Sequence, residues 1–291
     1  MKKSILALAA FVTLGFAAFT GCGDSGEFNP SREINVITRE DGSGTRDAFV
    51  ELLDIRVTAD GVTRDMTSPD AEIAPATNLV ISRVEGNTYA IGYISLGSLN
   101  DSVRALHIDG VAPTAANIFS GTYPLFRPFY LATQHERDAL TQEFLNFVLS
   151  AEGQAVVSGR GYVPAVDGAP AYHAPSGLSG TVVVSGSTSI ESLMLRLKEA
   201  FEDIHPNVTI EVHSGGTGVG ITATVAGTAN IGMASRALRD SEIAQGLEPI
   251  AIAYDGVVVI VNPENPTTNI SQADLRSVFV GDTTRWESIA D

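Results

Sequence analysis

The chain alternates between the short period of strands and the longer period of helices. Apolar and polar residues alternate over positions 34–37, as in a half-buried strand, and apolar residues within 48–53 then lie on one face of a helix. The same succession returns later, with an apolar strand at 181–184 and a helix whose apolar face runs from Ile190 to Ile204. Strands that alternate with helices in this way predict an α/β protein.

The rest of the pattern predicts more elements of both kinds. Strands are expected at 88–96, 103–108, 208–212, 229–236 and 257–261, and helices at 136–150, from near Val219, and from a capping Ser271 to a terminal Gly281. Residues 127–131 are predicted to cross in extended form, and 78–84 fit a helix or a strand. Residues 55–76 are expected to be irregular. Residues 165–180 are rich in Pro, Gly, Ala and Ser, which predicts a linker.

The first 21 residues have the pattern of an export signal. Lys2 and Lys3 precede an apolar run at 5–19, which is short for a membrane span. Cys22 follows directly and is the only cysteine, which resembles the lipid-carrying cysteine of bacterial lipoproteins. We therefore expect a lipoprotein signal peptide at 1–21, a lipid anchor on Cys22 and a small polar tether at 22–33. The alternative is cleavage nearby that leaves a soluble product.

Charge and length narrow the class of protein. The formal net charge is −16, which argues against nucleic acid and anionic membrane surfaces as partners. Surface charge is screened over roughly 8 Å at physiological salt, so donors at ~3 Å decide whether a buried site binds an anion. A chain of 291 residues is long for one core and suits two lobes.

The stretch from Arg39 to Arg46 has the design of a socket for an oxyanion. Residues 42–45, Gly-Ser-Gly-Thr, stand between the first strand and its helix, so they form a turn that ends at a helix N-terminus. The first backbone N–H groups of a helix lack internal partners, and the helix dipole adds partial positive charge there. Glycines let an anion approach closely, hydroxyls donate, and Arg39 can add a fork of charged donors.

Similar polar junctions follow other predicted strands. They lie at 42–45, 186–189, 214–218 and 235. Such loops share the carboxyl ends of strands in α/β sheets, where ligands bind, so several converging junctions predict one site. The histidines lack metal-ligand spacing, and no serine has a paired His and Asp in a recognisable setting. We therefore expect no metal, no cofactor and no enzymatic activity.

These motifs resemble a known family. Residues 37–46 are similar to the signature of the phosphate-binding proteins of bacterial ABC importers, and 186–189, the glycine-rich loop at Thr217, 231–236, 90–93 and 153–154 are similar to other segments of that family. The resemblance implies a two-lobed type II periplasmic-binding-protein fold. Its lobes are joined by two hinge strands, here near 253–261 and 127–131, and enclose the anion in the cleft between them.

The order of the motifs differs from that family. There the half that resembles 186–236 comes first, and the segment like 278–286 leads into the half that carries Arg39 to Thr45. We therefore interpret the chain as circularly permuted, with 165–180 joining the family's old ends. A piece of a tandem protein or a misassembled gene is the alternative. Lobe II is then 34–127 completed by 263–291, and lobe I is 128–262.

The resemblance also implies which residues bind. Arg39, Ser43, Gly44 and Thr45 would bind phosphate from lobe II, and Ser187, Thr188, Thr217 and Ser235 from lobe I, with Asp41 orienting Arg39. Many relatives carry an Asp after the serine of the third loop, where it accepts the proton of monohydrogen phosphate. Arg236 stands there in this chain, which leaves the choice of oxyanion open.

The resulting hypothesis is an extracytoplasmic binding protein that is lipid-anchored to the bacterial cell membrane. It captures inorganic phosphate and delivers it to the permease of an ABC transporter, and we expect it to be a monomer. Another oxyanion, such as sulfate, molybdate or tungstate, is one alternative. An adhesion or signalling lipoprotein that keeps the fold for protein contacts is another.

Overall fold

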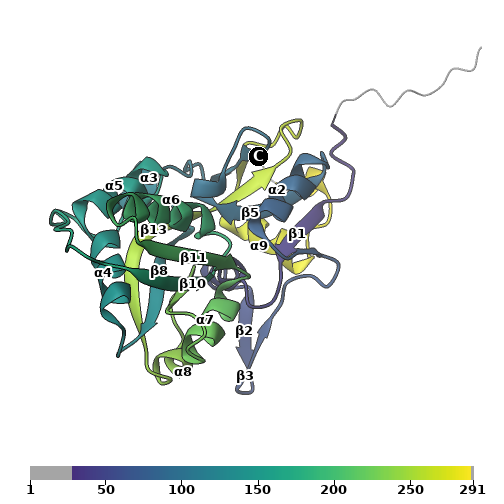
Figure 1. Ribbon diagram of the computed structural model, residues 1–291. Coiled ribbons are helices and arrows are strands. Elements are labelled where there is room, and N and C mark those ends of the chain that lie inside the picture. The colour runs from purple at the N-terminus through teal and green to yellow at the C-terminus, as the bar shows by residue number, and fades with distance from the viewer. Residues whose placement is uncertain (1–27, 290–291) are drawn as a thin grey trace, which may run out of the picture.

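Two lobes make up the part of the chain that the computed structural model describes, residues 28–289 (Figure 1). The main sheet runs through both lobes in the strand order β11-β10-β12-β8-β13-β5-β1-β4. Lobe II, at the upper right of Figure 1, contains β1 and α9, and lobe I, at the lower left, contains β10 and α6. This is the α/β, two-lobed architecture that the sequence pattern predicts.

Lobe II is built from both ends of the described chain. Its sheet contains β1 (Asn35–Arg39), β4 (Glu72–Ala74), β5 (Ala90–Ser95), β6 (Arg104–Ala105) and the end of β13 (Leu247–Val261). Its helices are α1 (Gly44–Leu52), α2 (Thr77–Glu85), α3 (Ala115–Phe119), α9 (Gln272–Val280) and the 3-10 turns η1 (Leu96–Ser98) and η2 (Trp286–Ser288). The small pair β7 (His107–Ile108) and β14 (Asn269–Ile270) ties the two chain segments together. The expected strand at 103–108 is thus broken into two short pieces.

Lobe I is built from the middle of the chain. Its strands are β8 (Phe126–Gln134), β9 (Val163–Pro164), β10 (Gly180–Gly186), β11 (Val208–Ser214), β12 (Ile231–Ala234) and the first part of β13. Its helices are α4 (Ala139–Val148), α5 (Ala151–Gly159), α6 (Glu191–Ile204), α7 (Thr217–Val225) and α8 (Asp240–Ile243). Helix α5 was not predicted; it begins because the Ser150 hydroxyl caps it by accepting from the Gly153 N–H at 3.2 Å.

Each lobe has its own hydrophobic core, and the core in which a residue is buried shows to which lobe that part of the chain belongs. In lobe II, the Phe49 ring stacks on Tyr93 with centroids 4.0 Å apart, and Phe279 packs against both. In lobe I, Phe144, Phe147 and Phe201 pack around α6. Residues 257–261 of β13 are buried in the cores of lobe II, not in those of lobe I. The expected lobe boundary at 262 is therefore too late.

Strand β13 carries the chain from one lobe to the other. It pairs with β8 as far as Gly256 and with β5 from Val257 onward. The chain crosses between the lobes a second time beside β13, at the start of β8. There the Val257 N–H donates to the Leu125 carbonyl at 2.7 Å. Two adjacent extended strands between separate cores form a hinge of the kind that two-lobed binding proteins use.

Residues 55–76 are more regular than expected. They contain a hairpin of β2 (Arg56–Ala59) and β3 (Val62–Asp65), followed by β4. The connecting Asp60 and Gly61 both have positive φ, 52° and 73°. An Asp-Gly pair is the usual signal for this turn, and its flanking Val and Thr residues are exposed, so hydrophobic alternation gave no hint of it.

The two ends of the described chain lie side by side on lobe II. The Ile34 N–H donates to the Thr284 carbonyl at 2.8 Å, and the Glu287 N–H donates to the Pro30 carbonyl at 2.8 Å. Phe28 stacks on Tyr89 and meets Trp286 edge-on. Residues 28–33, expected to be part of a tether, are therefore packed on the lobe. Residues 1–27, with the predicted signal peptide and Cys22, lie outside the described residues.

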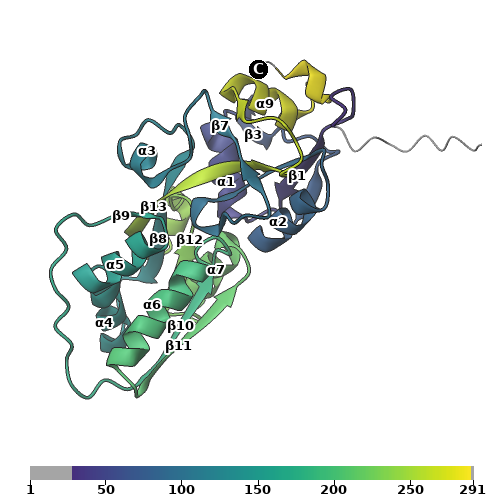
Figure 2. The ribbon, with the colours of Figure 1, turned by 90° about the horizontal axis from the view of Figure 1, so that it is seen from above.

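Residues 165–180 join β9 to β10 and contain no helix or strand before Gly180. Figure 2 shows this segment along the outer edge of lobe I, beside α4 and α5. It keeps contact with the lobe, because the Tyr172 hydroxyl lies 2.9 Å from His205 Nε2. Between residues 28 and 289, none of the helices is both long enough and apolar enough to cross a membrane.

Candidate anion site between the lobes

The N-termini of helices from both lobes meet at the surface where the lobes face each other. Helices α1 and α2 begin there from lobe II, and α6 and α7 from lobe I. Helix α1 is capped by the Ser43 hydroxyl, which accepts from the Arg46 N–H at 3.4 Å, but α2, α6 and α7 have no side-chain cap. Uncapped backbone N–H groups and the positive ends of helix dipoles attract anions.

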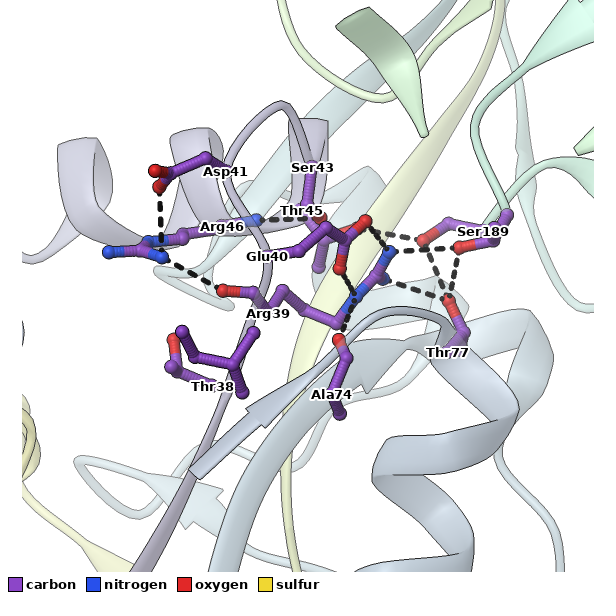
Figure 3. Close-up of polar contacts among 12 residues, drawn as sticks. Thr38, Arg39, Glu40, Asp41, Ser43, Thr45, Arg46, Ala74, Thr77 and Ser189 are labelled. Carbon is purple, nitrogen blue, oxygen red and sulfur yellow. Dashed lines mark hydrogen bonds and ion pairs between the residues drawn. The ribbon is translucent and has the colours of Figure 1, made fainter. Parts of the chain in front are cut away.

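Arg39 occupies the lobe II side of this surface and is almost fully buried (Figure 3). Its Nη2 donates to the Thr188 hydroxyl of lobe I at 3.1 Å, and its Nη1 to the Thr77 hydroxyl of lobe II at 3.2 Å. Its Nε lies 3.2 Å from the Ala74 carbonyl. The guanidinium is thus held in one orientation by groups from both lobes.

Glu40, not Asp41, orients Arg39. The two Glu40 carboxylate oxygens accept from Arg39 Nε and Nη2, each at 2.8 Å. The Asp41 carboxylate is exposed and lies 3.1 Å from Arg46 (Figure 3). The expectation for Asp41 was wrong, because the Asp41 carboxylate lies in solvent beside Arg46 while the Glu40 carboxylate takes the Arg39 guanidinium.

Hydroxyl groups from the two lobes contact each other next to Arg39. The Thr45 hydroxyl of α1 lies 2.7 Å from the Ser189 hydroxyl of the loop before α6. The Thr77 hydroxyl lies 3.1 Å from that of Thr188 and 3.4 Å from that of Ser189. All of these hydroxyls can donate, so this part of the surface offers several hydrogen-bond donors to one small ligand.

A second group of hydroxyls lies against the backbone of Gly44. The Ser187 hydroxyl donates to the Ser235 hydroxyl at 2.9 Å, and the Ser235 N–H donates to the Thr217 hydroxyl at 3.1 Å. A Cβ placed on Gly44 would stand 2.7 Å from the Ser235 hydroxyl oxygen and would collide with Thr217. Only glycine allows the lobes to approach this closely at the start of α1.

The structure thus brings the predicted binding residues together from both lobes. Arg39, Thr45, Ser187, Thr188, Thr217 and Ser235 present side chains to this surface, Gly44 presents backbone, and Ser43 caps α1. Two further residues take part that the sequence analysis did not select, Thr77 and Ser189. Ser189 belongs to the predicted loop at 186–189. Thr77 is the first residue of α2, and because the sequence did not decide between a helix and a strand at 78–84, it did not indicate a helix N-terminus at Thr77.

Ion pairs hold the lobes together beside the hydroxyl groups. Asp47 of α1 accepts from Arg236 Nε at 2.9 Å and from Arg239 Nη2 at 2.7 Å, both from lobe I. Asp47 also accepts from Arg56 at 2.7 Å, and Glu242 binds Arg236 in bidentate fashion at 2.8 and 2.7 Å. The Arg236 side chain is therefore committed to carboxylates beside the site. Glu242 hydrogen-bonds to Arg236, which holds its pKa below the usual value despite burial.

A buried ion pair lies at the hinge and touches the site from behind. Arg127 donates through Nε and Nη2 to Asp255 Oδ2, at 3.1 and 2.9 Å, and through Nη1 to the Ser235 carbonyl at 3.0 Å. The Ser95 hydroxyl and the Leu96 N–H of lobe II donate to the other Asp255 oxygen. Burial raises the pKa of Asp255 to about 6, and the Arg127 charge opposes that rise.

The arrangement suits capture of a small oxyanion. It combines a guanidinium, hydroxyls from both lobes and helix N-termini in a buried place, and the Glu40 carboxylate balances the Arg39 charge. Between residues 28 and 289, no group of three or more His, Cys, Asp or Glu side chains is arranged to hold a metal ion. These features are those of a two-lobed binding protein with its candidate site between the lobes.

Comparison with known proteins gives the same class. A family model described as PBP superfamily domain matches residues 24–152 and 171–290. Two curated relatives named Phosphate-binding protein PstS 2 match over nearly their whole length. The one from Streptococcus agalactiae serotype V is 39% identical over 100% of both chains, and the one from Streptococcus pneumoniae serotype 4 is 43% identical over 99% of both.

A solved structure agrees with these relatives. It is the crystal structure of the phosphate-binding protein of a phosphate ABC transporter from Streptococcus pneumoniae TIGR4, 43% identical, with a TM-score of 0.71 over 89% of this chain and 100% of that one. The chain therefore belongs to the PBP superfamily and, within it, to the PstS family of phosphate-binding proteins. This family consists of substrate-binding proteins of transporters and not of enzymes.

Proposed function

We propose that the protein captures inorganic phosphate between its two lobes and delivers it to the permease of an ABC transporter. The names of its relatives support phosphate as the ligand and an ABC transporter as the partner. PstS-type binding proteins are extracytoplasmic, and the apolar run at 5–19 ahead of Cys22 fits that location.

The observation that carries the proposal is the contact of Arg39 with hydroxyls of both lobes. Arg39 reaches Thr188 of lobe I and Thr77 of lobe II at once, so a ligand bound to it would contact both lobes. Micromolar binding needs about 8 kcal/mol. Several hydrogen bonds to a charged ligand, at roughly 1.5–3 kcal/mol each before ordering costs, can supply this without net positive charge.

The position of Arg236 keeps other oxyanions open as ligands. The residue after Ser235 is this arginine and not a carboxylate, so that position offers no acceptor for a proton of the ligand. The Arg236 guanidinium itself pairs with Asp47 and Glu242. Glu40 provides a carboxylate beside Arg39 and could take that role. A protein that tells monohydrogen phosphate from sulfate needs such an acceptor, since sulfate carries no proton at neutral pH.

Calorimetric titration of the purified protein with phosphate, sulfate and molybdate tests the ligand. We expect phosphate to bind in the micromolar range or tighter and the other two more weakly. Preferred binding of sulfate or molybdate would assign the site to that oxyanion. No binding of any of the three, with retained binding to a protein surface, would favour the adhesion or signalling role.

The membrane anchor is proposed on Cys22, which lies outside the described residues. It is the only cysteine and directly follows the apolar run of the leader. Replacing it, Cys22→Ala, should release the protein into the soluble fraction while phosphate binding is unchanged. Retention of the variant in the membrane would contradict a lipid anchor on this residue.

We also propose that the chain is circularly permuted and monomeric. The side-by-side position of residues 28–34 and 284–289 supports an old connection at this point, and the family match leaves out 153–170, where the linker begins. The relative from Streptococcus agalactiae aligns along the whole chain in one order, which argues against a misassembled gene.

Light scattering over a range of concentrations tests the proposed monomer. It should give a monomer that binds phosphate. A binding-competent dimer with no active monomer would indicate domain swapping.

A further inference from the structure

A hollow between the lobes opens directly beside the candidate site. It measures about 430 Å³ and lies between α2 and η1 of lobe II and the ends of α5 and α6 of lobe I. Its polar lining includes Thr77, Ser98, Asn100, Arg160, Thr188 and Ser192. Two of these residues, Thr77 and Thr188, also accept hydrogen bonds from Arg39, so the hollow adjoins the candidate site.

Two polar atoms in this hollow lack partners. Within residues 28–289, the buried side-chain atoms that have no hydrogen-bond partner are Arg160 Nε and Ser192 Oγ, and both residues line the hollow. A buried donor without a partner costs about 1–3 kcal/mol, so such groups in a folded protein call for an explanation. A ligand that passes through the hollow would satisfy both.

Within the described part of the chain, Arg160 lacks a carboxylate partner, unlike the buried arginines around the site. Arg39, Arg127 and Arg236 each hold a carboxylate within 2.9 Å. Among the described residues, the Arg160 side chain makes no hydrogen bond to a partner and no ion pair within 4.0 Å, although Glu191 lines the same hollow. Its positive charge is therefore less neutralised than theirs, in a protein whose formal net charge is −16.

We propose that this hollow is an encounter site for the oxyanion, where Arg160 and Ser192 bind it before it moves inward to Arg39. The inference rests on the proposed function and names how the ligand enters. An uncompensated cation in a hollow beside the candidate site attracts an anion against the repulsion of an acidic surface. Such a charge acts mainly on the association rate and its salt dependence.

The kinetics distinguish an entry residue from a residue of the closed site. Removing a cation that acts during approach lowers the association rate constant and leaves dissociation unchanged. Removing a group that holds the bound ligand raises the dissociation rate instead. Among the described residues, the Arg160 side chain makes no hydrogen bond to the inner hydroxyls that hold Arg39, so we expect its removal to change association and not dissociation.

Stopped-flow measurement of phosphate binding tests the proposal on the full mature chain. An environment-sensitive fluorophore on a cysteine introduced at Ser241, with Cys22→Ala to leave one thiol, reports closure from another edge of the lobe contact. For Arg160→Gln we expect the association rate constant to fall about three- to tenfold and to depend less on salt, with dissociation within about twofold of the parent. Arg160→Lys should restore most of the rate because it restores the charge.

Arg196→Gln is the matched control. Arg196 lies on α6, the helix that carries Ser192, is 58% exposed and pairs with Glu199, so its removal changes the net charge as the removal of Arg160 does, at a residue that does not line the hollow. An equal fall of the association rate in both variants, or an unchanged rate in Arg160→Gln, would overturn the encounter site. So would a rise in dissociation that accounts for the whole loss of affinity. Failure of the parent protein to bind any oxyanion would overturn the proposed function itself.

Discussion

Asp47 and Arg236 form an ion pair across the two lobes, with Asp47 Oδ2 2.9 Å from Arg236 Nε. Both side chains are largely buried, 12% and 7% exposed, although they come from α1 and from the loop after β12, far apart in the sequence. Arg239 joins the same carboxylate oxygen at 2.7 Å. Because these partners belong to different lobes, the ion pair ties one lobe to the other.

Replacing Asp47 should therefore weaken ligand retention. In Asp47→Asn we expect roughly tenfold weaker phosphate binding, equal to about 1.4 kcal/mol, mainly through faster dissociation. A charge-assisted hydrogen bond is worth about 1.5–3 kcal/mol, and the loss stays at the lower end because Arg236 still pairs with Glu242. Calorimetry and stopped-flow kinetics measure both quantities. Asp60→Asn, at the exposed hairpin tip where Asn tolerates positive φ, should bind like the parent. Equal affinity in both variants would contradict the role of the ion pair.

Arg39→Ala should weaken phosphate binding without unfolding the protein. It removes the guanidinium that contacts Thr77 and Thr188, and loss of its charge-assisted bonds costs about 1.5–3 kcal/mol, roughly 10- to 150-fold in affinity. Thr45→Ala should show a smaller loss in the same direction. The control is Arg64→Ala, in the exposed strand β3, which changes the net charge equally. Parent-like affinity in Arg39→Ala, measured by titration, would refute the site.

Gly44→Ala should prevent tight closure while leaving each lobe folded. The added Cβ would stand 2.7 Å from the Ser235 hydroxyl oxygen and would collide with Thr217, so the lobes must separate at the start of α1. We expect phosphate affinity to fall at least tenfold and small-angle scattering to show a wider particle. Gly159→Ala, at a helical position with open space around its Cβ, is the control and should change neither. Tight binding by Gly44→Ala would mean that the lobes meet differently there.

The hinge carboxylate Asp255 should make stability depend on pH. Its pKa is raised from 3.8 to about 6, chiefly by burial, so the folded protein holds a proton that the unfolded chain releases. The stabilisation from this proton is complete below about pH 4 and is lost as the pH rises through about 6.

Urea unfolding of the parent and of Asp255→Asn from pH 4 to 7 measures this effect. The free energy of unfolding of the parent, relative to the variant, should fall as the pH rises through this window. Asp65→Asn, measured below about pH 5, should give the opposite slope. Hydrogen bonds from Thr67 and the Arg46 charge lower the pKa of Asp65 below its usual 3.8, so the parent gains stability relative to that variant as the pH rises through this lower range. A difference between parent and Asp255→Asn that does not change with pH would show that Asp255 keeps its ordinary pKa in the fold.

Local sequence patterns determined much of the fold. The alternation at 34–37, the apolar face from Ile190 to Ile204 and the Ser271 cap with Gly281 behind it each specify an element through neighbouring residues, and β1, α6 and α9 form there. The hairpin at Asp60 and Gly61 was missed because its flanking residues are exposed and show no core-facing alternation. Its turn chemistry was nevertheless readable from the chain.

The binding residues were partly readable for the same reason. Glycine and hydroxyl residues at strand ends indicate a helix N-terminus open to an anion, and this selected the loops at 42–45 and 186–189. Pattern and spacing do not show which way a side chain points once the chain turns. Asp41 was therefore assigned to Arg39, whereas Glu40 holds it, and Thr77 was not selected at all.

The sequence by itself determined the α/β class, the positions of most elements and the loops that carry hydroxyl groups, because these depend on residues close together in the chain. Only the tertiary structure decided which residues meet across the lobes. The contacts of Thr45 with Ser189, Asp47 with Arg236, and Arg39 with Thr188 each join positions more than 100 residues apart. Such contacts arise from how β8 and β13 set one core against the other, and no local pattern encodes that orientation.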